Sequence, residues 1–203
     1  MGSTDQAFAA YVQAFVSEPA RLPSPAGGET DDLSAQRVVF DAGLGDDEFA
    51  AIEARFRFTF PADLRALLAV GLPVSDGFPN WRSAPEDDLE RLLEWPADGI
   101  CFDIERSGFW LGSWGPKPLD LDAAVSIARE RIAQAPTLIP IYRQHYIADE
   151  PPVAGNPVFS VHKRDIIVYA DGLHEYLERD FKAREVGTST RARAIRFWSD
   201  LAA

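Results

Sequence analysis

The residues that could carry covalent chemistry are few and isolated. Cys101 is the single cysteine among 203 residues, and a nucleophilic cysteine needs a nearby base and a lowered pKa. It lies between Ile100 and Phe102 in a segment with the pattern of a strand, where a small buried hydrophobic residue is expected. We therefore interpret Cys101 as a core residue. With one cysteine no internal disulfide can form, which favours a reducing, cytoplasmic compartment.

The three histidines do not form a metal-binding pattern. His145, His162 and His174 are separated by 17 and 12 residues, whereas zinc motifs usually place two ligands within about five residues of each other. We interpret these histidines as surface or hydrogen-bonded side chains. The sequence therefore predicts no bound metal and no cofactor.

Acidic residues that are close in the sequence form three pairs: Asp103 with Glu105, Asp120 with Asp122, and Asp149 with Glu150. A glycosidase needs two carboxylates that face each other across a cleft, which spacing along the chain does not show. We interpret Asp120 as a helix cap, and Asp103 and Glu105 as solvated residues beside a turn. Nucleophile-elbow, phosphate-loop and dinucleotide motifs are absent from the sequence. An enzyme whose cleft combines distant residues stays an alternative.

The net charge of −12 is concentrated in one part of the chain. Residues 29–105 contain 18 acidic and 6 basic side chains, and residues 86–105 contain eight acidic side chains and one arginine. Binding to phosphate groups requires a basic surface, so nucleic acid is excluded as a direct partner. Opposed electric fields accelerate association, which favours a basic protein partner. The alternative is a solvated face that only keeps the protein soluble.

Hydrophobic periodicity predicts helices separated by strands and long loops. The predicted helices span 4–17, 46–56 with Asp46 as cap, 61–71 with Gly71 as left-handed end, 87–95, 121–135, 171–181 with Asp171 as cap, and 190–202. The predicted strands are Gly99–Ile104 paired with Phe109–Trp114, Leu138–Tyr142 with Pro140 at an edge or bulge, and Pro157–Val161 paired with Ile166–Tyr169. Loops are predicted at 18–36 and 72–85.

These elements predict an α+β fold. Strands bracketed by helices without alternating βαβ units favour a mainly antiparallel sheet with helices packed around it. A length of 203 residues favours a single domain. Apolar runs of membrane-spanning length and the features of a signal peptide are absent from the sequence. Frequent alanine and arginine with only three lysines favour a GC-rich bacterial genome.

Two sequence motifs carry a family resemblance. The first combines Glu53, Phe60-Pro61, Asp63, Leu64, Leu67-Leu68 and Gly71, and the second is Gly155–Val161 followed by Asp165–Tyr169. Between them, Ile100-Cys101-Phe102 and Trp110 are placed like a central hairpin. In this order and spacing, residues 45–183 resemble the SUKH superfamily, which includes fungal regulators of cell-wall assembly and bacterial immunity proteins. The resemblance implies an α+β core at 45–183, an N-terminal extension at 1–44 and a C-terminal helix at 184–203.

Charge and resemblance together predict a non-enzymatic protein-binding module. The most concrete version is an immunity protein that occludes a basic toxin domain such as a nuclease. The alternative is a regulatory scaffold with an endogenous protein partner. Trp110 and Trp114, four residues apart on a predicted strand, point to one face, which either packs under a helix or anchors a partner. The candidate binding residues are Asp87, Asp88, Asp103, Glu105, Trp110 and Trp114.

Overall fold

The computed structural model describes residues 3–18, 20–23, 37–182 and 192–202. The helices in these residues are α1 (Ser3–Ser17), α2 (Asp46–Phe56), α3 (Ala62–Val70), α4 (Glu86–Ser107), α5 (Leu121–Ile132), α6 (Leu173–Lys182) and α7 (Trp198–Leu201), with a 3-10 turn η1 (Gly112–Trp114). The strands are β1 (Phe40–Ala42), β2 (Gly71–Pro73), β3 (Leu138–Tyr142), β4 (His145–Ala148), β5 (Val158–His162) and β6 (Asp165–Ala170). The predicted α+β fold is confirmed. Within the described residues, every helix is too short or too polar to cross a membrane.

The larger sheet is an antiparallel meander in the order β3-β4-β5-β6. The predicted strand β3 and the predicted hairpin β5–β6 are confirmed. Pro140 lies on the edge strand β3, next to a register shift, where its missing N–H removes no central ladder bond. The sequence analysis missed β4, because its four residues are all buried and therefore lack an alternating pattern.

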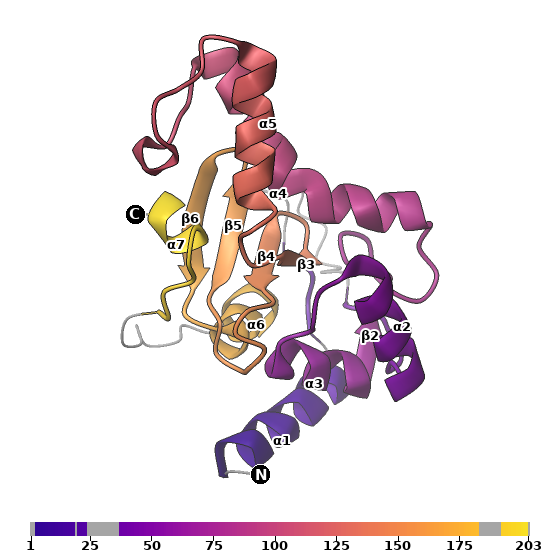
Figure 1. Ribbon diagram of the computed structural model, residues 1–203. Coiled ribbons are helices and arrows are strands. Elements are labelled where there is room, and N and C mark those ends of the chain that lie inside the picture. Colours follow the sequence, from indigo (N-terminus) through magenta and orange to yellow (C-terminus); the bar gives the residue numbers. More distant parts are fainter. Residues whose placement is uncertain (1–2, 19, 24–36, 183–191, 203) are drawn as a thin grey trace, which may run out of the picture.

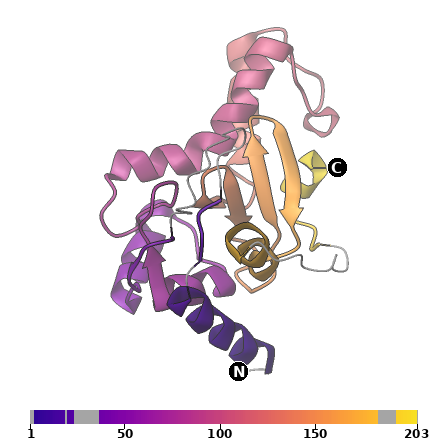
Figure 2. The same cartoon turned by 180° about the vertical axis from the view of Figure 1, so that it is seen from behind.

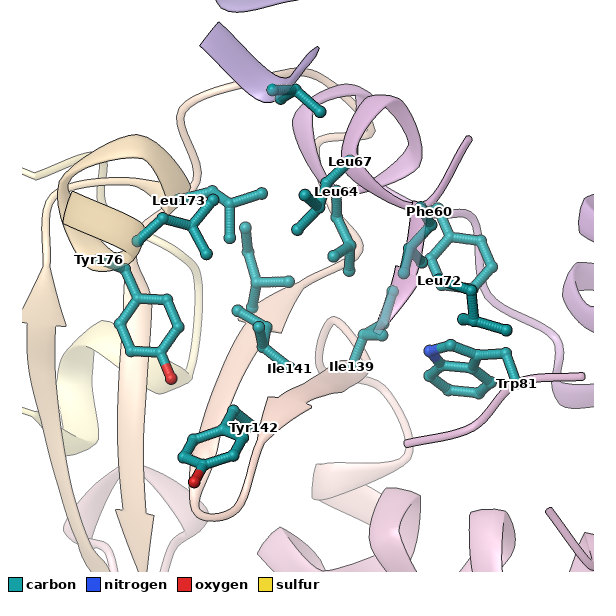
Figure 3. Packing of buried hydrophobic residues seen from close by; sticks show 14 of the residues in the cluster. Phe60, Leu64, Leu67, Leu72, Trp81, Ile139, Ile141, Tyr142, Leu173 and Tyr176 are labelled. Carbon is teal, nitrogen blue, oxygen red and sulfur yellow. The ribbon is translucent and has the colours of Figure 1, made fainter. Parts of the chain in front are cut away.

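Helices cover both faces of this sheet. Figure 1 views the sheet from the side of α5 and α7, and Figure 2 views it from the side of α6. Alternate strand residues therefore belong to two cores: Val158 packs on the α6 side, whereas Phe159 packs with α4, α5 and α7. The α6-side core extends to α1, α2 and α3. Its members include Phe60, Leu64, Leu67, Ile139, Ile141 and Leu173 (Figure 3).

Helix α3 forms largely as the sequence predicts, with a different C-terminus. Pro61 is the N-cap, and Leu64, Leu67 and Leu68 are buried. Gly71 does not adopt the left-handed conformation expected of a helix end, since its φ of −163° and ψ of 132° are extended, and it begins β2. The glycine is needed there because a Cβ atom would lie 2.8 Å from Val16 Cγ1 of α1.

Helix caps show one confirmed prediction and two differences. The Asp120 side chain accepts a hydrogen bond from Ala123 N at 2.7 Å and caps α5, as predicted. Asp46 is the first residue of α2 rather than its cap, which is Gly45. Asp171 precedes α6, and its backbone N–H donates to the Glu175 carboxylate at 2.8 Å, so this hydrogen bond has the opposite direction to the predicted cap.

The predicted hairpin, in which Gly99–Ile104 pairs with Phe109–Trp114, is wrong. Helix α4 includes both the predicted short helix 87–95 and the first predicted strand of that hairpin. Its 22 residues continue through Pro96 and end at Ser107, and the C-cap Gly108 adopts a left-handed φ of 72°. Pro96 has no N–H to donate to the carbonyl of Leu92. The Tyr146 hydroxyl of β4 donates to that carbonyl at 3.1 Å instead. A tertiary contact therefore completes the backbone hydrogen bonding where the proline interrupts it.

The two segments of α4 on either side of Pro96 run in different directions in Figures 1 and 2. The second segment packs against α5 through buried Ile100 and Ile104. Gly99 allows close contact with the β5–β6 turn, because a Cβ atom there would lie 2.6 Å from Lys163 Cα. The central hairpin suggested by the SUKH resemblance is therefore a bent helix followed by the turn η1.

The predicted C-terminal helix 190–202 is only partly within the described residues. Residues 183–191 lie outside them, and the helix that is described, α7, begins at Trp198. The side chains of Ile195 and Trp198 are buried, and Trp198 Nε1 donates to Pro136 O at 2.6 Å. Most of the predicted loop 18–36 also lies outside the described residues.

Candidate partner-binding site

The exposed side of α4 gathers acidic side chains with two aromatic residues. Spacings of three and four residues place these side chains along one side of the helix. We call this surface the acidic face; its residues are Asp87, Glu90, Glu94, Trp95, Asp98, Phe102 and Glu105, all exposed. The whole of α4 contains eight acidic and two basic residues, a net charge of −6.

Several acidic groups of α4 already have cationic partners. Glu86 pairs with Arg55 of α2, Asp88 with Arg91, and Asp98 with Arg129 of α5 at 2.8 Å. For Asp87, Glu90, Glu94 and Glu105, no ion pair is found with any cationic side chain of the described residues. These four carboxylates are therefore the ones whose charge is available to a partner.

Trp95 is the largest exposed apolar group of the acidic face. Half of its surface is exposed (50%), and 41% of Phe102 is exposed. Lys163 Nζ lies 4.4 Å from the centre of the Phe102 ring, so this ring already has a cationic neighbour. No aromatic or cationic contact to Trp95 occurs within the described part of the chain. Trp95 is therefore the side chain best placed to act as an anchor.

The structure does not place Trp110 and Trp114 on this face. The prediction that they share one strand is wrong, because Trp110 precedes η1 and Trp114 lies within it. Trp114 is 9% exposed and belongs to the core on the α4 side. Trp110 packs edge-to-face on it with ring centres 5.1 Å apart, and its Nε1 donates to Gly115 O at 2.8 Å. Trp114 therefore packs in the core and Trp110 packs against it, and a contact of either residue with a partner stays a prediction.

The four predicted acidic residues have different surroundings. Asp87 and Glu105 are exposed parts of the acidic face. Asp88 is half-exposed and paired with Arg91. Asp103 is half-buried and accepts a hydrogen bond from Arg164 N at 3.1 Å, which holds the β5–β6 turn against α4. The sequence analysis missed Glu90, Glu94 and Trp95 as site residues, although their spacing from Asp87 contained the signal.

Cys101 and the histidines have structural surroundings. Cys101 is buried, as predicted, but on α4 rather than on a strand, and burial raises the pKa of its thiol. His145 is buried on β4, with its Nδ1 3.1 Å from the Tyr176 hydroxyl, and burial together with Arg179 lowers its pKa to about 4. His162 and His174 are exposed. Across the described ranges, no group of three or more His, Cys, Asp or Glu side chains could hold a metal ion.

The two sequence motifs meet in space. Asp63 is 4% exposed; its Oδ1 accepts from Leu64 N at 3.0 Å and its Oδ2 accepts from Gly155 N at 2.9 Å, a contact that spans 92 positions of the chain. Burial raises the pKa of Asp63, while these N–H donors and Arg193 partly oppose the rise. The buried Asn156 amide then donates to Ala148 O and Pro151 O. The motifs therefore fix backbone positions and carry no reactive constellation.

Comparison with known proteins identifies no protein similar to this chain. No family model, curated protein or solved structure matches the chain. The resemblance to the SUKH superfamily therefore stays a prediction from the sequence motifs.

Proposed function

We propose that this chain is a non-enzymatic protein-binding module and that the acidic face of α4 binds a basic protein partner. The observation that carries the proposal is the combination of four carboxylates without ion pairs and the half-exposed indole of Trp95 on one helix. Tryptophan is enriched among the residues that dominate binding energy, whereas charged residues mainly set partner choice and association rate. The acidic face contains both kinds of residue.

The most concrete version of this proposal is an immunity protein that occludes the active site of a basic toxin domain. It rests on the SUKH resemblance of the two motifs that Asp63 and Gly155 join. A nuclease would be a suitable target, because its substrate groove already attracts negative charge. The alternative partner is an endogenous basic protein. A neighbouring gene that encodes a large secreted protein with a C-terminal toxin domain would favour the first version.

The test uses a basic toxin domain from a neighbouring gene, immobilised for binding kinetics. Reversal of Glu90 and Glu94 to lysine should slow association at least about tenfold at low salt and flatten its dependence on ionic strength. The matched control reverses Asp122 and Glu130, exposed acidic residues of α5, and should leave the rate within about twofold. Equal effects of the two sets would indicate that only net charge matters and would contradict a defined site.

Trp95→Ala tests the anchor separately. A buried interface aromatic contributes mainly to the dissociation rate, so this rate should rise by roughly tenfold or more while association changes little. The matched control is Leu121→Ala, which removes another exposed apolar side chain from α5. An unchanged dissociation rate in Trp95→Ala would show that the indole is outside the interface.

A further inference from the structure

A cleft on the opposite side of the sheet from the acidic face has the size of a ligand site. It lies between α1, α3, the loop at residues 154–155 and the first turn of α6, and its volume is about 510 Å³. Small-molecule sites usually measure about 300–1,000 Å³. The space exists because the walls consist largely of residues with little or no side chain: Ala7, Ala62, Ala66, Ala154, Gly155 and Gly172.

One wall of the cleft is aromatic. The rings of Tyr11 and His174 meet edge-on, with centres 4.1 Å apart and an angle of 77° between them. Phe8 meets His174 in the same way at 6.4 Å. Flat rings that enter such a site gain from burial and from edge-to-face contacts with the wall. The shape and lining therefore favour an aromatic body of moderate size.

The single carboxylate of the lining is Asp63. Its two oxygens each accept one backbone N–H, and an ionised carboxylate has about four acceptor positions, so capacity for further donors remains. No lysine or arginine of the described ranges forms an ion pair with it. Arg193 is the nearest cation in electrostatic effect, but its guanidinium donates to Asn156 Oδ1 at 2.6 Å and to Ala154 O. A buried, unpaired negative charge in an apolar cleft is complementary to a cation.

We propose that this cleft binds an arylalkyl primary amine, with the ammonium group donating to Asp63 and the ring packed between the alanines of α3 and the aromatic wall. Each part of this ligand class corresponds to one feature of the cleft: the charge to Asp63, the ring to Phe8, Tyr11 and His174, and the moderate size to the volume of about 510 Å³. The proposal does not depend on the acidic face of α4.

The experiment titrates the full chain with three ligands that share one ring, and follows binding by calorimetry. Tryptamine carries the ammonium group, tryptophol replaces it with a hydroxyl, and indole-3-propionate replaces it with a carboxylate. Tryptamine should bind at least about tenfold more tightly than tryptophol, and indole-3-propionate should not bind at millimolar concentration. Equal binding of tryptamine and tryptophol, or no binding of tryptamine up to about 10 mM, would overturn the proposal.

Two substitutions on one helix locate the bound ligand. Ala66→Phe fills the cleft and should weaken tryptamine binding at least about tenfold, whereas Ala69→Phe, at an exposed position of α3 outside the lining, should leave it unchanged within about twofold. Asp63→Asn should remove the preference for tryptamine over tryptophol. Because Asp63 also holds Gly155, a melting curve accompanies this variant, and Ala66→Phe keeps the test valid if Asp63→Asn does not fold. Tryptamine binding that survives Ala66→Phe would place the ligand elsewhere and overturn the assignment.

Discussion

The two faces of the four-stranded sheet are held in different ways. On the α6 face, buried polar groups contact one another: His145 stacks on Tyr169 and lies beside the Tyr176 hydroxyl, and Tyr169 donates to Asp180 at 2.9 Å. On the α4 face, the core is apolar, and its polar aromatic groups donate to backbone carbonyls, as Trp198 does to Pro136. Polar side-chain pairs fix the orientation of a packed helix through charge and hydrogen bonding, whereas apolar cores fix that orientation through the shapes of the packed side chains.

This difference separates the sensitivities of the two faces. A face with buried titratable groups should respond to pH, because burial changes the cost of ionisation. Both faces contain apolar cores and should respond to added or removed volume, whereas the response to pH should come mainly from the α6 face. The following predictions test that separation, beginning with the largest expected effect.

Removal of core volume beside α3 should have the largest effect. Leu67 is almost fully buried on the α6 side, and Leu67→Ala should lower the free energy of unfolding by roughly 2–4 kcal/mol, through lost burial and the cavity that remains. Denaturant melts measure this change. Leu119→Ala is the matched control, because Leu119 is fully exposed, and it should change stability by less than about 0.5 kcal/mol. A loss below about 1 kcal/mol for Leu67→Ala would contradict the packing of α3.

Added volume at Gly99 should disturb the α4 face. Alanine usually stabilises a helix by up to about 1 kcal/mol relative to glycine. At Gly99 the new Cβ would lie 2.6 Å from the backbone of Lys163, so Gly99→Ala should instead destabilise the protein by roughly 1–2 kcal/mol. Gly112→Ala meets no atom within 4 Å and serves as the control. A stabilising Gly99→Ala would show that α4 and the β5–β6 turn separate readily.

The pH dependence of stability should reveal His145. Burial lowers the pKa of His145 to about 4, below the ordinary value of 6.5 for histidine, so the unfolded chain binds more protons between these values. The His145 contribution to stability is therefore complete above about pH 6.5 and is lost as the pH falls toward 4. Burial raises the pKa of Asp149 from 3.8 to about 6. In that window the folded state binds the extra proton, and the contribution of Asp149 has the opposite sign.

The two contributions oppose each other between about pH 4 and 6, so removal of Asp149 should expose the effect of His145. The free energy of unfolding of Asp149→Asn should fall more steeply on acidification than that of the unsubstituted protein, by up to about 1.4 kcal/mol per pH unit for one proton. Urea melts at several pH values measure the slopes. Parallel slopes for the two proteins would contradict the raised pKa of Asp149.

Neutralisation of charge on the acidic face should have the smallest effect on folding. Glu90 and Glu94 are exposed and without ion pairs to any described cation. Glu90→Gln with Glu94→Gln should therefore change the free energy of unfolding by less than about 0.5 kcal/mol. The same melts measure this change. A loss above about 1 kcal/mol would show that these carboxylates support the fold rather than remain available to a partner.

The parts of the fold that the sequence predicts well are those whose signals are local. Pro61, Asp63 and the leucines of α3 lie within one helix, and the β5–β6 hairpin closes over a two-residue turn at Lys163 and Arg164. Segment 99–114 was misassigned because Pro96 and Gly99 are typical breaks in a helix. The helix tolerates Pro96 because the Tyr146 hydroxyl donates to the free carbonyl of Leu92, and it needs Gly99 because Lys163 lies close to it. Both Tyr146 and Lys163 are distant in the sequence.

The sequence predicts the acidic character of the candidate site but only some of its residues. The density of acidic residues marks residues 86–105, which belong to α4, but the sequence predicts a helix only over 87–95. The helical spacing that joins Glu90, Glu94 and Trp95 to the second half of α4 is therefore seen only in the structure. The prediction that Trp110 and Trp114 share one face, either under a helix or as a partner anchor, depends on a strand that does not exist in the structure. The contact between Asp63 and Gly155 could not be predicted from either motif alone, since each lacks information on the position of the other.

The strand order of the larger sheet has a kinetic consequence. Each strand from β3 to β6 pairs with the next one along the chain, so the loops that close them are short and cost little entropy. The contact of Asp63 with Gly155, by comparison, closes a loop of 92 residues. We expect the meander to form in the folding transition state and α3 to dock after it. Leu67→Ala should then accelerate unfolding and leave the refolding rate nearly unchanged, whereas Val158→Ala within β5 should slow refolding.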